Sequence, residues 1–204
     1  IDFSSLNFKD ALILNNGGKI VKKYPFVPGI DFSGTVEESE DEKFKKDDKV
    51  ILTGFRVGEI YYGGFSQYAK VNSDFLVKLP KDLTNKKAMM MGTAGLTALL
   101  CSFAVKAKEE LLMGSKVKDV LVTGATGGVG SFAVMALSKM GYDVHAVTGK
   151  KEKHDYLKKL GAKNILDRKE FMGESKLLEK GMWDCVVDNV GGEGLTKILA
   201  QTKP

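Results

Sequence analysis

Apolar and polar residues in the first part of the chain form short alternating segments that are typical of β-strands. The end of a strand is predicted at the start of the segment 1–7, a short helix over 8–14, and further strands over 30–37, 49–54, 65–71 and 75–80. Glycine and proline separate these segments, as they do where turns join strands. Several short strands of this kind predict a small, partly open β-barrel.

The pattern changes near Thr84. Helices are predicted over 84–91 and 96–108, with the sequence GTAG at 92–95 between them. After Val117, strands over 120–123, 144–147, 164–166 and 183–188 alternate with helices over 131–140, 151–160, 176–180 and 195–201. Such alternation predicts an α/β fold with a doubly wound parallel sheet. The expected domains are 1–92, β-rich, and 93–204, doubly wound.

The chain is expected to be incomplete at both ends. It begins at Ile1 without a methionine, and about four strands are predicted after Val117, where a full dinucleotide-binding domain has roughly six.

A glycine-rich turn follows the apolar strand around Val120–Val122 and precedes the helix over 131–140. It places Ala125, Gly127 and Gly130 in the pattern A-x-G-x-x-G. Strand, glycine turn and helix form the context in which backbone amides and the helix dipole bind a pyrophosphate. The alternative is a turn that only packs a strand against a helix.

The next predicted strand ends at Val147, and Thr148 to Lys151 follow it, about 20 residues past the turn, where a dinucleotide fold places its ribose-reading residue. An NAD-binding protein would have Asp or Glu there, whereas this chain has Thr148, Lys150 and Lys151. Hydroxyl and ammonium groups suit a 2′-phosphate, so the cofactor is inferred to be NADPH. The alternative is a solvated loop with a chance basic pair.

Composition excludes several classes of protein. The 204 residues carry a net charge of +5, but basic residues alternate with acidic ones, as in 42–48, so nucleic acid is not an expected partner. No apolar run of about 18 residues is apparent, so no membrane association is expected. Two cysteines, Cys101 and Cys185, and two histidines are too few for a four-cysteine zinc site. The protein is expected to be metal-free and cytoplasmic, with reduced thiols.

Several segments together resemble the medium-chain dehydrogenase/reductase superfamily over nearly the whole chain: VPGIDFSGTV at 27–36, GG at 63–64, GTAGLTA at 92–98 and the turn at 125–130. Within it, SSLNFKDA at 4–11 and YLKKLGA at 156–162 resemble the zinc-free quinone oxidoreductase branch, in particular a bacterial group that includes acryloyl-CoA reductases. The resemblance implies a GroES-like domain followed by a Rossmann domain. It also implies a homodimer that transfers a hydride from NADPH to a small molecule, either a quinone or a conjugated C=C such as that of acryloyl-CoA.

The resemblance also implies cofactor-binding positions, namely Phe8, Thr126, Gly127, Gly128, Val129, Gly130, Thr148, Gly149, Lys150 and Arg168. Relatives often have Tyr in place of Phe8 and Arg in place of Lys150. Lysine offers a point charge rather than a two-pronged contact, so the preference for NADPH could be weaker. Zinc-dependent relatives have a histidine at the position of Ile30, which agrees with the metal-free expectation.

The catalytic residues cannot be identified from the sequence, and Asn7 and Asp31 are the candidates. Hydride transfer needs orientation more than acid–base groups. Asn7 either orients the nicotinamide or substrate or caps a local turn. Asp31 is either a polar group in the cleft or a structural carboxylate. Tyr61 and Tyr62 either donate a proton or are simply exposed loop residues.

Two other functions fit parts of this sequence. The turn also fits short-chain dehydrogenases, but no tyrosine here has a lysine four residues later, and the turn follows about 120 residues rather than lying near the start. That class is rejected. A non-catalytic NADPH-binding sensor or structural protein remains the alternative, because hydride transfer requires few obligatory side chains.

Overall fold

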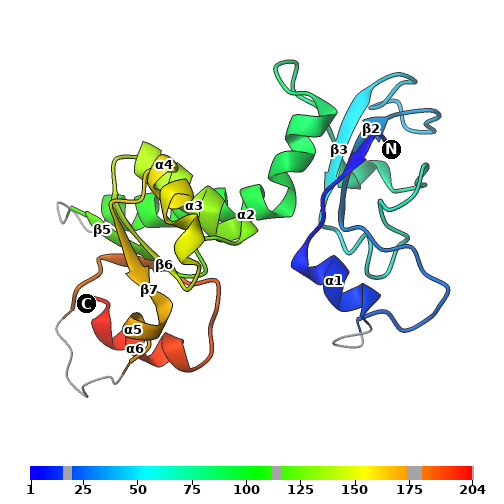
Figure 1. Ribbon diagram of the computed structural model, residues 1–204. Helices are drawn as coiled ribbons and strands as arrows, with labels where there is room; N and C mark the ends of the chain where they lie inside the picture. The colour runs from blue at the N-terminus through cyan, green and yellow to red at the C-terminus, as the bar shows by residue number, and fades with distance from the viewer. Residues whose placement is uncertain (16–19, 112–115, 174–180, 204) are drawn as a thin grey trace. The chain divides into compact units, whose positions relative to one another are not determined.

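The computed structural model describes residues 1–15, 20–111, 116–173 and 181–203. The chain divides into two compact units, Ile1–Ala94 and Gly95–Pro204 (Figure 1). The first unit contains an antiparallel sheet and the second a parallel one. Together they confirm the predicted α/β fold class.

The sheet of the first unit contains four strands in the order β1 (Phe3–Ser4), β2 (Asp31–Thr35), β3 (Lys49–Thr53) and β4 (Leu76–Lys78). The β2–β3 register pairs Phe32 with Leu52, and both side chains are buried beside Val57. Helix α1 (Phe8–Leu14) follows β1, as predicted. A short 3₁₀ turn, Ser73–Phe75, leads into β4.

The predicted strand over 65–71 is wrong, because the structure has turns and irregular backbone there. The hydroxyl of Ser66 donates a hydrogen bond to the carbonyl of Tyr68, two residues later. The carbonyl of Gln67 accepts one from the backbone nitrogen of Ile1. Alternating side chains indicate a strand only where a neighbour completes its ladder of backbone hydrogen bonds.

Helix α2 (Asn85–Leu111) joins the two helices predicted around the GTAG sequence. Gly92 interrupts it with φ 47° and ψ −152°, a conformation that favours glycine. An 18-residue window of α2 has a mean hydropathy of 1.7, so by length and composition the helix could cross a membrane. The expectation that the chain has no apolar run of about 18 residues did not take this helix into account. Ala98 and Val105 of α2, however, lie in the core of the second unit beside Val120 and Val122.

The parallel sheet of the second unit contains β5 (Asp119–Val122), β6 (Asp143–Thr148), β7 (Asn164–Asp167) and β8 (Cys185–Val187) in the order β7-β6-β5-β8. Its helices are α3 (Gly128–Lys139), α4 (His154–Lys159), α5 (Arg168–Phe171) and α6 (Glu193–Gln201). A 3₁₀ turn, Lys151–Lys153, precedes α4. The pattern did not predict α5, and the helix predicted over 176–180 lies outside the described residues.

Helix α3 packs by the face that contains its buried residues Gly130, Ala133, Val134 and Leu137. The buried side chains of α3 are small near the glycine turn and become larger toward the end of the helix. This allows the first turn of α3 to approach the end of β5 closely.

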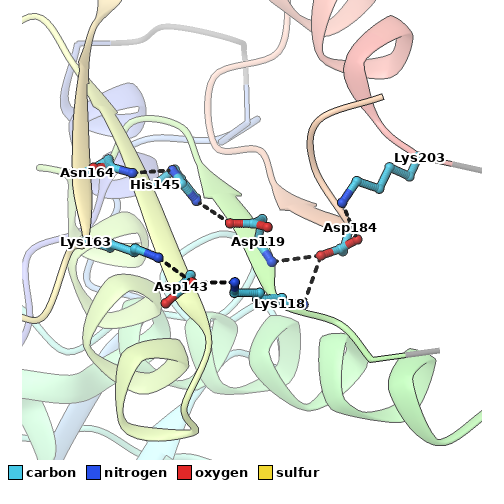
Figure 2. A network of polar contacts seen from close by, with 8 residues as sticks. All are labelled: Lys118, Asp119, Asp143, His145, Lys163, Asn164, Asp184 and Lys203. Atoms are coloured by element: carbon cyan, nitrogen blue, oxygen red, sulfur yellow. Dashed lines mark hydrogen bonds and ion pairs between the residues drawn. The ribbon is translucent and has the colours of Figure 1, made fainter. Parts of the chain in front are cut away.

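A polar network joins the amino ends of the parallel strands (Figure 2). His145 Nε2 lies 2.9 Å from Asp119 Oδ1, and its Nδ1 lies 3.2 Å from the side-chain amide of Asn164. Asp184 accepts hydrogen bonds from the amides of Lys118 and Asp119 and from Lys203 Nζ. These contacts hold the amino ends of the strands together. They lie at the edge of the sheet opposite to the carboxyl ends of the strands.

Candidate cofactor site

The strand order of the parallel sheet defines where a ligand would bind. Strand β6 lies beside β5, and β7 lies beside β6. Strand β8 lies on the other side of β5. Ligands of open α/β sheets bind at the carboxyl edge where the strand order reverses. Here the reversal lies between β5 and β8.

The glycine turn after β5 has the geometry of a phosphate-binding turn. Gly124 has φ 56°, and the Gly127 amide donates a hydrogen bond to its carbonyl at 2.9 Å. A Cβ on Gly130 would collide with the carbonyl of Gly124 and lie 2.8 Å from Ala125 Cα. The turn therefore brings α3 against the strand, with Gly127 and Gly128 exposed at the start of the helix. The first amides of a helix are free to bind an anion.

A cavity of about 180 Å³ lies at this edge of the sheet. Residues at the carboxyl ends of four strands line it: Thr123, Gly124 and Thr126 after β5, Val147 and Thr148 at the end of β6 with Gly149 and Lys150 after it, Arg168 and Met172 after β7, and Val190 after β8. The cavity thus extends from the glycine turn to the strand end where a ribose-reading residue is expected.

The cationic part of the cavity is built by β6 and α5. A Cβ on Gly149 would lie 3.3 Å from Arg168 Nε, so the guanidinium rests against the backbone of this glycine. Asp167 begins α5 by accepting a hydrogen bond from the Lys169 amide at 2.8 Å, and this bond lowers the pKa of its carboxyl. The Thr148 hydroxyl is buried and accepts a hydrogen bond from the Lys150 amide at 3.1 Å. Thr148, Lys150 and Arg168 therefore meet at one end of the cavity.

Most of the predicted cofactor-binding residues come together here. Thr126, Thr148, Gly149, Lys150 and Arg168 line the cavity. Gly127 to Gly130 lie in the adjoining turn and the first turn of α3. Phe8 belongs to the first unit, where it is exposed at the start of α1. The role of each position as a cofactor contact stays a prediction.

The loop after β8 was missed by the sequence analysis. Asp188 accepts hydrogen bonds from the Thr123 hydroxyl and from the amides of Val190 and Gly191. The sequence signal was available, because Asp188 ends a buried strand and precedes the pair Gly191-Gly192. Without the strand order, nothing connected this loop to the glycine turn.

In the first unit, Asp31 organises a cluster that contains the other catalytic candidate. Its side chain is fully buried. The carboxylate accepts hydrogen bonds from Ser5 Oγ at 2.7 Å, Asn7 Nδ2 at 3.0 Å, and both the amide and hydroxyl of Thr93. Four donors saturate it, which favours the structural interpretation of Asp31 over contact with substrate. Asn7 is the N-cap of α1, and its backbone amide donates to Asp10 Oδ2 at 2.8 Å. Its partly buried side chain also donates to Ser5 Oγ at 3.4 Å, and these contacts support the interpretation of Asn7 as a cap.

A loop with exposed aromatic side chains follows β3. Phe55 and Arg56 have positive φ values of 52° and 62°, which are uncommon for these residues. The buried Val57 anchors the loop. Phe55 stacks on Phe75 with ring centres 4.8 Å apart, yet 53% of Phe55 is exposed. Tyr61 and Tyr62 are also exposed, at 52% and 63%. The loop therefore presents rings and a cation to solvent.

No cluster of three or more His, Cys, Asp or Glu side chains that could hold a metal ion occurs among residues 1–15, 20–111, 116–173 and 181–203. Ile30, which the resemblance implies is at the zinc-ligand position, has no donor atom in its side chain. The described residues do not provide a zinc site.

The parallel sheet, the glycine turn and the cationic cavity define a dinucleotide-binding protein. Comparison with known families agrees. Residues 1–81 match the alcohol dehydrogenase GroES-like domain, and residues 128–204 match the zinc-binding dehydrogenase family. The chain belongs to the medium-chain dehydrogenase/reductase superfamily.

Three relatives show how close the similarity is. The acrylyl-CoA reductase AcuI of Ruegeria pomeroyi is 50% identical over 204 residues, which are 100% of this chain and 61% of that protein. The yhdH oxidoreductase of Salmonella enterica, solved in complex with NADP, is 50% identical with a TM-score of 0.90, covering 98% of this chain and 60% of that one. The yhfP protein of Bacillus subtilis, solved with NAD bound, is 44% identical with a TM-score of 0.87 and the same coverage of 98% and 60%. The chain thus spans about three fifths of the length of these relatives.

Proposed function

We propose that the protein is a zinc-independent oxidoreductase that reduces a conjugated C=C, such as that of acryloyl-CoA, or a quinone with NADPH. The observation that carries the proposal is the position of Lys150 and Arg168 beside Thr148, at the end of the cavity that begins at the glycine turn. Two cations at the ribose-reading position favour a phosphorylated ribose over a free one.

The glycine turn fits the cofactor's pyrophosphate. Gly130 has no room for a Cβ, and the exposed Gly127 and Gly128 leave the start of α3 open to an anion. The amides of this turn would bind the pyrophosphate, and Arg168 and Lys150 would bind the 2′-phosphate. When bound, the cofactor supplies a hydride equivalent.

Relatives support both nicotinamide cofactors. One was solved with NADP and another with NAD. Because Lys150 is a point charge, the planar guanidinium of Arg168 is the stronger candidate to select NADPH. Selection by two exposed cations is expected to be salt-sensitive.

In the first unit, the side-chain NH₂ group of Asn7 donates to Asp31 and to Ser5 Oγ, so it is a fixed group beside α1 rather than a free donor to a carbonyl. The exposed loop with Phe55, Arg56 and Tyr61 offers aromatic faces and a cation to a substrate that carries an adenine and phosphates. These features favour a coenzyme A thioester over a simple quinone. Homodimer formation and a cytoplasmic location are part of the proposal.

The experiment measures oxidation of NADPH by the full-length protein with acryloyl-CoA, with a benzoquinone and with no acceptor. NADH in place of NADPH is the cofactor control. Rapid NADPH oxidation that depends on acryloyl-CoA supports the proposal. Turnover with the quinone alone points to a quinone reductase. Tight NADPH binding with no turnover of either acceptor favours the non-catalytic sensor and contradicts the proposed function.

A further inference from the structure

We propose that Asp188 is a positioning residue for the cofactor. Together with the hydroxyl of Thr123, it holds the loop over 188–192 in place as one wall of the nucleotide cavity. This inference rests on the proposed function, because it assumes that the cavity binds NADPH. It assigns a role to a loop that the sequence analysis left without one.

The contact between the two strand ends is reciprocal. Thr123 is fully buried at the end of β5, and its hydroxyl donates a hydrogen bond to Asp188 Oδ1. The same hydroxyl accepts a hydrogen bond from the Asn189 amide at 2.9 Å, and the Asn189 side chain donates to the Thr123 carbonyl at 2.9 Å. The side chains of Thr123, Asp188 and Asn189 thus join the carboxyl ends of β5 and β8.

Asp188 also fixes the loop that follows it. Its Oδ1 accepts a hydrogen bond from the Val190 amide at 3.3 Å, and its Oδ2 accepts one from the Gly191 amide at 2.9 Å. Val190 lines the cavity but is 56% exposed. Packing alone therefore does not hold this side chain, and its position depends on the backbone that Asp188 fixes.

A carboxylate is the group that this arrangement requires. Its oxygens meet three donors, namely the Thr123 hydroxyl and the amides of Val190 and Gly191. An asparagine at 188 would keep the size of the side chain but replace one acceptor by an NH₂ group, which can only donate. At least one amide of the loop would lose its partner, and the wall would become mobile.

The chain provides a matched control at the other end of the same strand. Asp184 lies just before β8 and caps two backbone amides, those of Lys118 and Asp119, as Asp188 caps those of Val190 and Gly191. Figure 2 shows this contact in the network at the amino edge, and none of its residues lines the cavity. The same Asp→Asn change can therefore be made at both ends.

The experiment measures two quantities for D188N and D184N in the full-length protein: the dissociation constant for NADPH and the unfolding temperature. We expect D188N to raise the dissociation constant about tenfold, in line with the loss of a hydrogen bond to a charged group. D184N should lower the unfolding temperature but bind NADPH like the wild type. If D188N binds like the wild type, the inference is overturned.

Variants of Thr123 keep the inference testable should D188N fail to fold. T123V removes the hydroxyl while keeping the shape of the side chain, and T123S keeps the hydroxyl. T123V should weaken NADPH binding and T123S should restore it. The double variant T123V/D188N should bind no more weakly than D188N alone, because the two groups act as a unit. Equal affinities in T123V and T123S would also overturn the inference.

The affinity for adenosine 2′,5′-bisphosphate separates this inference from the proposed function. A wild-type protein that binds neither this compound nor NADPH would contradict the proposed function itself, and the assigned role of Asp188 would fall with it. A wild type that binds both, with unchanged affinities in D188N and T123V, would contradict only the role of Asp188.

Discussion

Asp31 accepts two hydrogen bonds from Thr93, one from the backbone amide at 2.7 Å and one from the hydroxyl at 2.6 Å. This contact begins the second segment of α2 directly after the break at Gly92. A side chain of β2 thus acts as the cap of a helix that lies 62 residues later in the chain. The same carboxylate holds Asn7.

Replacing Asp31 by asparagine should destabilise the protein by about 2–3 kcal/mol, because an amide cannot accept from all four donors. The measurement is denaturant unfolding, with the exposed Asp82→Asn as the control. G92A should also be destabilised, since its Cβ would lie 2.6 Å from both Asp31 Oδ2 and Ser5 Oγ at a φ of 47°. A D31N protein as stable as D82N would contradict the structural role of Asp31.

Arg168→Ala should raise the dissociation constant for NADPH about tenfold or more and leave that for NADH nearly unchanged, because the guanidinium is expected to contact only the 2′-phosphate. Lys150→Ala should act in the same direction. Binding titrations with both cofactors are the measurement, and Lys158→Ala on the exposed part of α4 is the control. Equal losses for NADPH and NADH would show that Arg168 does not read the phosphate.

Substituting Gly127 and substituting Gly130 should have different effects on NADPH binding and on stability. Gly127→Ala places a Cβ 3.2 Å from the Gly124 carbonyl at an exposed position, so it should weaken NADPH binding with little loss of stability. Gly130→Ala forces α3 away from β5 and should destabilise the protein by about 1–3 kcal/mol. Unfolding and binding measured on both variants test the distinction. It would be refuted by a G130A variant with wild-type stability.

Acid should remove the contribution of Asp184 to stability. Burial raises the pKa of this carboxyl, but hydrogen bonds from Lys203 and from the amides of Asp119 and Lys118 outweigh it, and the folded pKa lies below the ordinary 3.8. The stabilisation is therefore complete above the unfolded pKa and is lost as the pH falls through the lower folded value. The free energy of unfolding of D184N should change less than that of the wild type between pH 7 and roughly pH 3. Parallel curves for the two proteins would contradict this.

The sequence was sufficient to predict the elements that have strong local signals. The glycine turn between Val122 and α3 and the residues Thr148 and Lys150 were predictable, because their chemistry is tied to spacing along the chain. The strand over 65–71 was wrong because a strand also needs a partner.

The rest of the site depends on contacts between distant residues. Asp188 and Thr123 are 65 positions apart, and only the order of the strands makes them neighbours. The structural role of Asp31 likewise depends on Thr93, which lies 62 positions later in the chain. Hydrogen bonds between residues so far apart in the chain leave no periodic signal in the sequence.

The most direct test of the central claim follows deuterium from the cofactor into the product. The full-length protein is supplied with acryloyl-CoA and with NADPH that carries deuterium at its transferable position, and the product is analysed by mass spectrometry. We predict propionyl-CoA with one deuterium on the β-carbon and a solvent proton on the α-carbon. Unlabelled product, or NADPH that is bound but not consumed with acryloyl-CoA or a quinone, would contradict the account.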